Sequence, residues 1–101
     1  MAYVKVGSLS AMPPGTVREA EIGGRYYAVC NVAGTIHALD GTCPHRGGPV
    51  GQGALDGANL VCPWHAWEFD CASGAYDYDP TIKLKRFAVK VEGGDIFLDV
   101  G

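Results

Sequence analysis

The chain is 101 residues long, carries a formal net charge of −3 and is 48% hydrophobic. This length fits one domain with a core of its own, so we expect a single domain over residues 1–101. The charges are of mixed sign without a basic block, which excludes the electrostatic footprint of a nucleic-acid-binding protein. No apolar run approaches the roughly 18–20 residues of a membrane span, and the start of the chain lacks a signal-peptide pattern. We therefore expect a cytoplasmic protein.

The first half of the chain predicts strands separated by tight turns. Alternating or Val- and Tyr-rich runs occupy residues 3–6, 16–22, 25–32 and 35–39. The last two runs are joined by Ala33-Gly34 and predict a hairpin. Pro13 and Pro14 interrupt regular structure between the first two runs.

The second half begins with a Gly- and Pro-rich loop over residues 40–53. Short strands are predicted at 59–61 and 67–69, after a turn at Asp56-Gly57. The alternating runs 86–92 and 95–100 predict a final hairpin. No amphipathic run of helical length is present. Many short strands with frequent turns predict an all-β domain, as a two-layer sandwich or a partly open barrel.

Two segments of the chain each place a cysteine close to a histidine. A Cys-x-His motif occupies residues 43–45, and a Cys-x-x-His motif occupies residues 62–65. A tetrahedral zinc ion accepts two thiolates and two imidazoles. A 2Fe–2S cluster accepts the same set, with both cysteines on one iron and both histidines on the other. The candidate metal ligands are Cys43, His45, Cys62 and His65.

The spacing of these ligands favours iron. Zinc modules usually begin with two cysteines separated by two to four residues, whereas here each segment carries a mixed pair. A cluster with two different irons needs one cysteine and one histidine from each segment. With Gly47-Gly48-Pro49 after the first pair, the two motifs resemble a Rieske iron–sulfur protein. The resemblance covers roughly residues 22–101. The small size of the chain and four residues in and after the second motif are similar to those of the oxygenase-ferredoxin branch of the family: Trp64, Trp67, Phe69 and Asp70.

The resemblance implies a β domain in which a small part, about residues 41–75, binds the 2Fe–2S cluster at one tip. It also implies a one-electron carrier rather than an enzyme. Its partners would be a flavin-dependent NAD(P)H reductase and a terminal aromatic-ring oxygenase. We expect a monomer without nucleic-acid or membrane partners. Two alternatives stay open: the small subunit of an assimilatory nitrite reductase within the family, and a zinc-stabilised binding module from another class.

Several residues near the motifs have structural interpretations. Cys30 lies in an apolar strand and is expected to pack as a small buried hydrophobe, and Cys71 to pack beneath the second motif. A reducing compartment argues against a disulfide between them. His37 lies in an alternating apolar run and is expected to face a sheet rather than bind metal. Trp64 and Trp67 are expected to exclude water from the cluster, with an exposed docking patch as the alternative.

The ligand set also bears on the reduction potential. Two thiolates and two neutral imidazoles leave the oxidised cluster about neutral, whereas four thiolates would leave it at about −2. An electron enters a neutral site more easily, so such clusters lie between about −150 and +300 mV. High-potential members of the resembling family add a disulfide between the loops and hydroxyl donors to the sulfurs. The corresponding positions here are Gly48, Trp64, Trp67 and Phe69, which provide neither.

We therefore predict a reduction potential at the low end of this range, about −150 mV. Without those interactions the cluster polarises its histidine ligands less, so the potential should stay nearly constant between about pH 6 and pH 8. Voltammetry across this interval measures both properties. A proton-coupled slope that begins below about pH 8 would contradict the prediction.

Overall fold

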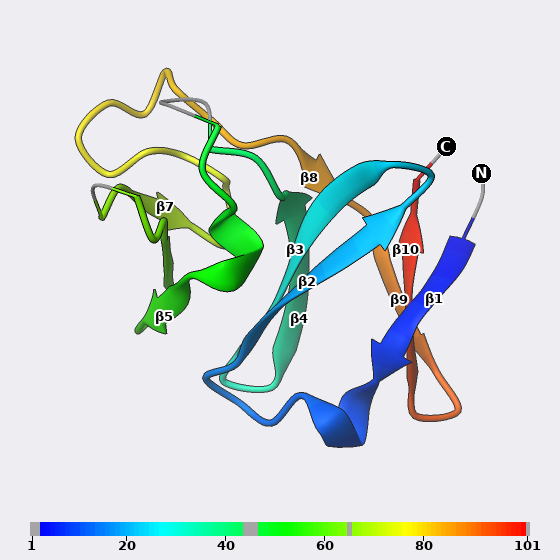
Figure 1. The fold of residues 1–101 in the computed structure, drawn as a ribbon. Coiled ribbons are helices and arrows are strands. Elements are labelled where there is room, and N and C mark those ends of the chain that lie inside the picture. The colour runs from blue at the N-terminus through cyan, green and yellow to red at the C-terminus, as the bar shows by residue number, and fades with distance from the viewer. Residues whose placement is uncertain (1–2, 44–46, 65, 101) are drawn as a thin grey trace.

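The computed structural model describes residues 3–43, 47–64 and 66–100 (Figure 1). Across these residues, ten strands form three antiparallel sheets. The central sheet has the order β2-β3-β4-β8, the terminal sheet β1-β10-β9 and the small sheet β5-β6-β7. The bounds are β1 Tyr3–Ser8, β2 Val17–Ile22, β3 Arg25–Val32, β4 Thr35–Asp40, β5 Ala54–Asp56, β6 Asn59–Val61, β7 Glu68–Asp70, β8 Arg86–Phe87, β9 Val89–Glu92 and β10 Asp95–Asp99.

The central sheet lies between the other two sheets and contributes to a core on each of its faces (Figure 1). Successive strand residues point to opposite faces, which divides β3 between the two cores. Tyr27 and Val29 belong to the core shared with the terminal sheet, whereas Ala28 and Cys30 belong to the core shared with the small sheet. This explains why β3 is an almost unbroken run of apolar residues rather than a strict alternation.

The two cores have different compositions. The core between the central and small sheets contains all four cysteines; its buried members are Ala28, Cys30, Leu39, Cys43, Val50, Leu60, Cys62, Phe69, Cys71 and Leu84. The core between the central and terminal sheets has Met12, Tyr27, Val29, Ala38, Ile96 and Leu98 as its buried members. Each expected site cysteine is therefore anchored in the first core.

The alternating run over residues 86–92 is not the single strand that the sequence predicts. Phe87 pairs with Ala38 of the central sheet, whereas Val89 pairs with Leu98 of the terminal sheet. The chain changes sheets at Ala88, so this expectation was wrong in its length. The change lets Phe87 and Val89 both pack into the core between these sheets. The final hairpin itself, β9 with β10, is confirmed.

The small sheet carries the segments that follow the Gly- and Pro-rich loop. The expected turn at Asp56-Gly57 is confirmed, with Gly57 at a φ of 60° joining β5 to β6. The strand β5 was not anticipated from the sequence, because it is three residues long and lies beside glycines. Two short 3-10 helices, Leu9–Ala11 and Val50–Gln52, complete the regular structure of the described residues.

The expected all-β architecture is confirmed: the sheets are antiparallel and do not close into a barrel. Within the part of the chain that the structure describes, no helix is long and apolar enough to cross a membrane.

Gly53 provides a test of this packing, because it lies where the Gly- and Pro-rich loop enters β5. A Cβ at this position would overlap the backbone carbonyl oxygen of Val61 in β6. Gly53→Ala should therefore cost about 3 kcal/mol of stability, which corresponds to a loss of at least about 12 °C in apparent Tm. Circular dichroism melts measure the shift. Gly7→Ala is the matched control, because a Cβ there has no neighbour within 4 Å. Equal melting of the two variants would contradict the prediction.

Candidate metal centre

Cys43 lies on the loop that follows β4. The backbone N–H of Gly41 donates to the carbonyl of Tyr26 at 2.9 Å, which fastens the start of this loop to β3. The N–H of Val50 donates to the carbonyl of Gly41 at 3.1 Å and brings the end of the loop back to its start. Between these two contacts, the N–H of Cys43 donates to the carbonyl of Gly48 at 2.8 Å. The loop is therefore closed on both sides of the cysteine.

Cys62 lies on a second loop that is closed in the same way. It follows β6 directly, and its N–H donates to the carbonyl of Trp67 at 2.7 Å, just before β7 begins. In both loops the cysteine N–H thus bonds the carbonyl five residues later. Ala66 in the second loop has a φ of 57°, a left-handed conformation that is strained for a residue with a Cβ. Such strain persists where the surrounding structure fixes the backbone.

The structure brings the two expected cysteine ligands together. Cys43 and Cys62 are 2% and 1% exposed, and the side chain of Cys43 lies close enough to influence the Cys62 thiol. Burial raises the pKa of the Cys62 thiol; the backbone of Trp64 lowers this pKa, and Cys43 raises it. Since a thiolate is the metal-binding form, a cation would have to compensate for this burial.

The two expected histidine ligands, His45 and His65, lie outside the described residues. Their role as ligands stays a prediction from the sequence.

The backbone of Gly48 lies close against the second cysteine. A Cβ on Gly48 would lie 2.9 Å from the Sγ of Cys62 and 3.1 Å from the indole ring of Trp64. Real Cβ atoms essentially never approach a neighbour this closely, so only glycine fits without movement. The close approach of this backbone to a thiol is typical of a site where main chain surrounds a sulfur-bound group.

The comparison with protein families matches residues 2–88 to the Rieske [2Fe-2S] domain. The chain belongs to this family. The expected family and its cofactor, a 2Fe–2S cluster, are thereby confirmed.

The similar proteins include small ferredoxins and much longer enzymes. The chain is 33% identical over 98 residues to Ferredoxin CarAc of Metapseudomonas resinovorans, covering 95% of this chain and 92% of that protein. It is also 33% identical over 101 residues to the 4beta-methylsterol monooxygenase of Methylococcus capsulatus, but spans only 27% of that protein's length. The match to ferredoxins over nearly their whole length confirms the expected class, an electron-transfer component rather than an enzyme.

Solved structures lead to the same family. A complex of reduced oxygenase and oxidized ferredoxin in carbazole 1,9a-dioxygenase contains a chain with a TM-score of 0.86 and 32% identity, covering 95% of this chain and 91% of that one. A protein from Mycobacterium tuberculosis described as the small subunit of an NADH-dependent nitrite reductase has a TM-score of 0.86, covering 99% and 96% of the two chains. Its identity of 18% shows a shared fold and nothing more.

The described residues fit a Rieske cluster. Two buried thiols in mutual contact present the sulfur pair that one iron of such a cluster takes. The backbone of Gly48 comes close to the Sγ of Cys62, as main chain does where it surrounds a sulfur-bound group. When bound, the cluster supplies a centre that gains and loses one electron, and the two cysteine loops would hold it.

The structure divides the roles of the two tryptophans. Trp67 is partly buried and stacks on Tyr76, with ring centroids 3.8 Å apart and planes 6° from parallel. It therefore covers the core that contains the cysteines, as expected. Trp64 is 48% exposed, which fits the alternative of an exposed patch better than a water-excluding cover. Tyr78 is 86% exposed and meets the edge of Tyr76, 5.8 Å away.

The other cysteines and His37 lie where the sequence places them, but with contacts that it did not reveal. Cys30 and Cys71 are fully buried free thiols in the core of the small sheet. Their mutual hydrogen bond raises the pKa of Cys30, with burial as the next cause, and lowers that of Cys71. His37 lies on one face of the central sheet, as expected, and its Nδ1 lies 3.2 Å from the Nη2 of Arg86. No pattern in the sequence connects these pairs, because they join distant segments.

Gly48→Ala tests whether the close approach to Cys62 matters for the cluster. The added methyl group should displace the Sγ of Cys62, so the cluster should be lost to an iron chelator about tenfold faster than from the parent protein. The loss of visible absorption with time measures this rate. Gly7→Ala, with open space around its Cβ, should behave as the parent does. If Gly48→Ala loses its cluster at the rate of the parent protein, the packing of Gly48 against Cys62 is looser than the structure indicates.

Proposed function

We propose that this protein is a soluble one-electron carrier between a flavin-dependent NAD(P)H reductase and a terminal aromatic-ring oxygenase. The observation that carries the proposal is the match, over nearly the whole of both chains, to a ferredoxin component. A second support is the likeness, at 32% identity, to a chain in a complex of oxygenase and ferredoxin. Residues 1–101 would form a single domain that contains the cluster.

The proposed ligands are Cys43 and Cys62 on one iron and His45 and His65 on the other. The contact between the two buried thiols supports the first half of this assignment. The sequence motifs support the second half, because each histidine follows its cysteine within the same closed loop. The cluster-binding part would extend over about residues 41–75, which includes the small sheet.

The electron would pass at the tip formed by the two cysteine loops. Exposed aromatic side chains there, Trp64 and Tyr78, offer apolar contact to a partner, while Trp67 and Tyr76 cover the core behind them. Small interfaces with few anchors suit an electron carrier, which must release each partner quickly. We propose in addition a cytoplasmic, monomeric protein of low reduction potential.

The experiment that tests this function combines metal analysis with EPR spectroscopy of the dithionite-reduced protein. We expect about two irons per chain and the rhombic signal of a cluster with mixed ligands, at a lower average g than an all-thiolate cluster gives. Cys43→Ser and His65→Ala should each abolish this signal. Cys30→Ala is the matched control, because it removes a buried cysteine outside the proposed ligand set and should keep the signal.

Two results would contradict the proposal. One bound zinc ion per chain without the EPR signal would mean that the metal is structural and that the protein does not transfer electrons. A signal of the all-thiolate type would mean that Cys30 or Cys71 serves as a ligand.

A second experiment tests the proposed partner. If the mixed-ligand cluster is present, NADH with a flavin reductase from a ring-hydroxylating dioxygenase system should reduce it. If this reduction alone fails, the assigned reductase partner is wrong and the assigned cluster is unaffected.

A further inference from the structure

Three exposed cations lie on and beside the edge strand β8: Arg25, Lys85 and Arg86. Among the described residues, the two ion pairs join Lys5 to Asp95 at 3.4 Å and Lys90 to Glu92 at 3.6 Å. None of the three cations at β8 forms such a pair within the described part of the chain. In a protein of net charge −3, an uncompensated positive group of this kind is unexpected.

Aromatic rings rather than carboxylates position two of these cations. The Cζ of Arg25 lies 5.7 Å from the ring centroid of Tyr27 and 6.0 Å from that of Phe87. The Nζ of Lys85 lies 5.3 Å from the centroid of Phe87. Tyr27 and Phe87 meet edge to face at 4.9 Å and are anchored in the core with the terminal sheet. Arg25 and Lys85 are thus held at one aromatic pair while their charges stay available.

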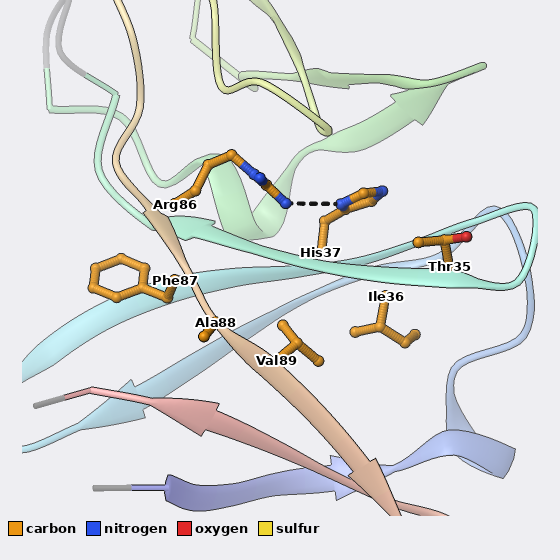
Figure 2. A pocket seen from close by; sticks show the side chains of 7 residues that line it. All are labelled: Thr35, Ile36, His37, Arg86, Phe87, Ala88 and Val89. Carbon is orange, nitrogen blue, oxygen red and sulfur yellow. Dashed lines mark hydrogen bonds between the residues drawn. The ribbon is translucent and has the colours of Figure 1, made fainter. Parts of the chain in front are cut away.

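A neutral imidazole positions the third cation. Figure 2 shows Arg86 and His37 extending from β8 and β4 on one side of the central sheet, with Phe87 on the other side. Because a guanidinium only donates, the Nδ1 of His37 accepts from Arg86 at 3.2 Å. Burial and then Arg86 lower the pKa of His37, while Asp70 raises it. The neutral ring orients Arg86 without cancelling its charge.

Two hollows adjoin along this edge of the sheet and share Arg86, Phe87 and Ala88. One, of about 320 Å³, is also lined by Arg25 and Lys85. The other, of about 400 Å³, contains His37 and is the hollow drawn in Figure 2. Asp99 lines the first hollow and adds one negative charge, which leaves the lining with an excess of positive charge. No lining residue of either hollow belongs to the two cysteine loops.

We propose that Arg25, Lys85 and Arg86 form a second interaction surface that receives carboxylates from an acidic surface of a protein partner. Guanidinium groups match carboxylates in a two-pronged geometry, and the ammonium of Lys85 adds a third donor group. The aromatic and imidazole contacts hold the three charges in place beforehand, so binding loses less side-chain freedom. Within the described residues, neither ion pair of the chain involves any of these three cations.

The occupant is an extended acidic surface rather than a single small anion, because the hollow of about 320 Å³ that all three cations line adjoins the hollow of about 400 Å³, whose lining also includes Arg86. This inference deepens the proposed function and rests on it: the acidic surface belongs to one of the two redox partners. Complementary charge of this kind raises the rate of encounter more than it raises affinity.

The experiment uses the cluster-loaded, ¹⁵N-labelled protein and an acetylated, amidated peptide of eight glutamates as the probe. Saturable chemical-shift changes are expected at the backbone amides of Arg25, His37, Lys85 and Arg86. The triple variant R25Q/K85Q/R86Q should bind the peptide about tenfold more weakly, as should the parent protein when NaCl is raised from 20 to 200 mM. Circular dichroism and cluster absorption check that each variant is folded and loaded.

Lys90→Gln is the matched control. Lys90 also lies against aromatic rings, 4.9 Å from the centroid of Tyr3 and 5.4 Å from that of Phe97, but Glu92 neutralises it. This variant should bind the peptide as the parent does. The single variant Lys85→Gln should weaken binding in part, which keeps the test decisive if the triple variant is unstable.

Three outcomes would overturn the proposal: no saturable shifts, shifts confined to other surfaces, or equal binding by the parent and the triple variant. Inorganic phosphate is titrated in parallel. If it reproduces the shifts at the same concentration as the peptide, the surface is a small-anion site, and the proposal of an acidic protein surface is wrong. EPR spectra of the same samples distinguish a failure of this proposal from a failure of the proposed function. If the cluster signal is present and the peptide does not bind, only the proposed interaction surface at β8 is wrong.

Discussion

The packing of both cysteine loops into one core is the constraint on which the proposed site depends. Each loop is closed by a hydrogen bond from the cysteine N–H to the carbonyl five residues later, and each thiol is then buried against the central and small sheets. The thiols of Cys43 and Cys62 are thus brought into contact by the fold. The same burial raises the pKa of Cys62, so a bound metal ion would have to stabilise the thiolate against this burial. Metal binding would then be coupled to the folding of this core.

The central sheet connects this core to the rest of the molecule. Because side chains of a strand alternate between faces, β3 supplies Cys30 to one core and Val29 to the other. The change of sheets at Ala88 completes the connection, since one short segment pairs first with β4 and then with β10. Arg86 and Phe87 consequently extend to opposite faces of the same edge strand (Figure 2). The proposed interaction surface of Arg25, Lys85 and Arg86 lies where the chain changes from the central to the terminal sheet.

Local sequence patterns predicted the strands and the metal-binding motifs, because both depend on residues close together in the chain. The alternation in the final hairpin and the glycine turns are of this kind. The alternation of Phe87, Val89 and Val91 concealed the change of sheets, because strands of two different sheets share the same period of two. The approach of Gly48 to Cys62 and the placement of Arg25 beside Phe87 join distant segments, and no local pattern reports such contacts. The histidine ligands rest on the motifs alone.

The two proposed surfaces suit the two requirements of an electron carrier. Electrons would enter and leave at the tip of the cysteine loops, so each partner must leave before the next one binds, and contact at the tip has to stay weak. Charges outside the tip can raise the rate of encounter without enlarging the contact that must later be broken. At β8 the cations are held by aromatic rings and an imidazole, which fixes their positions and leaves their charge uncancelled. Cations paired with carboxylates of the chain, as Lys5 and Lys90 are, would fix a position but lose this long-range attraction.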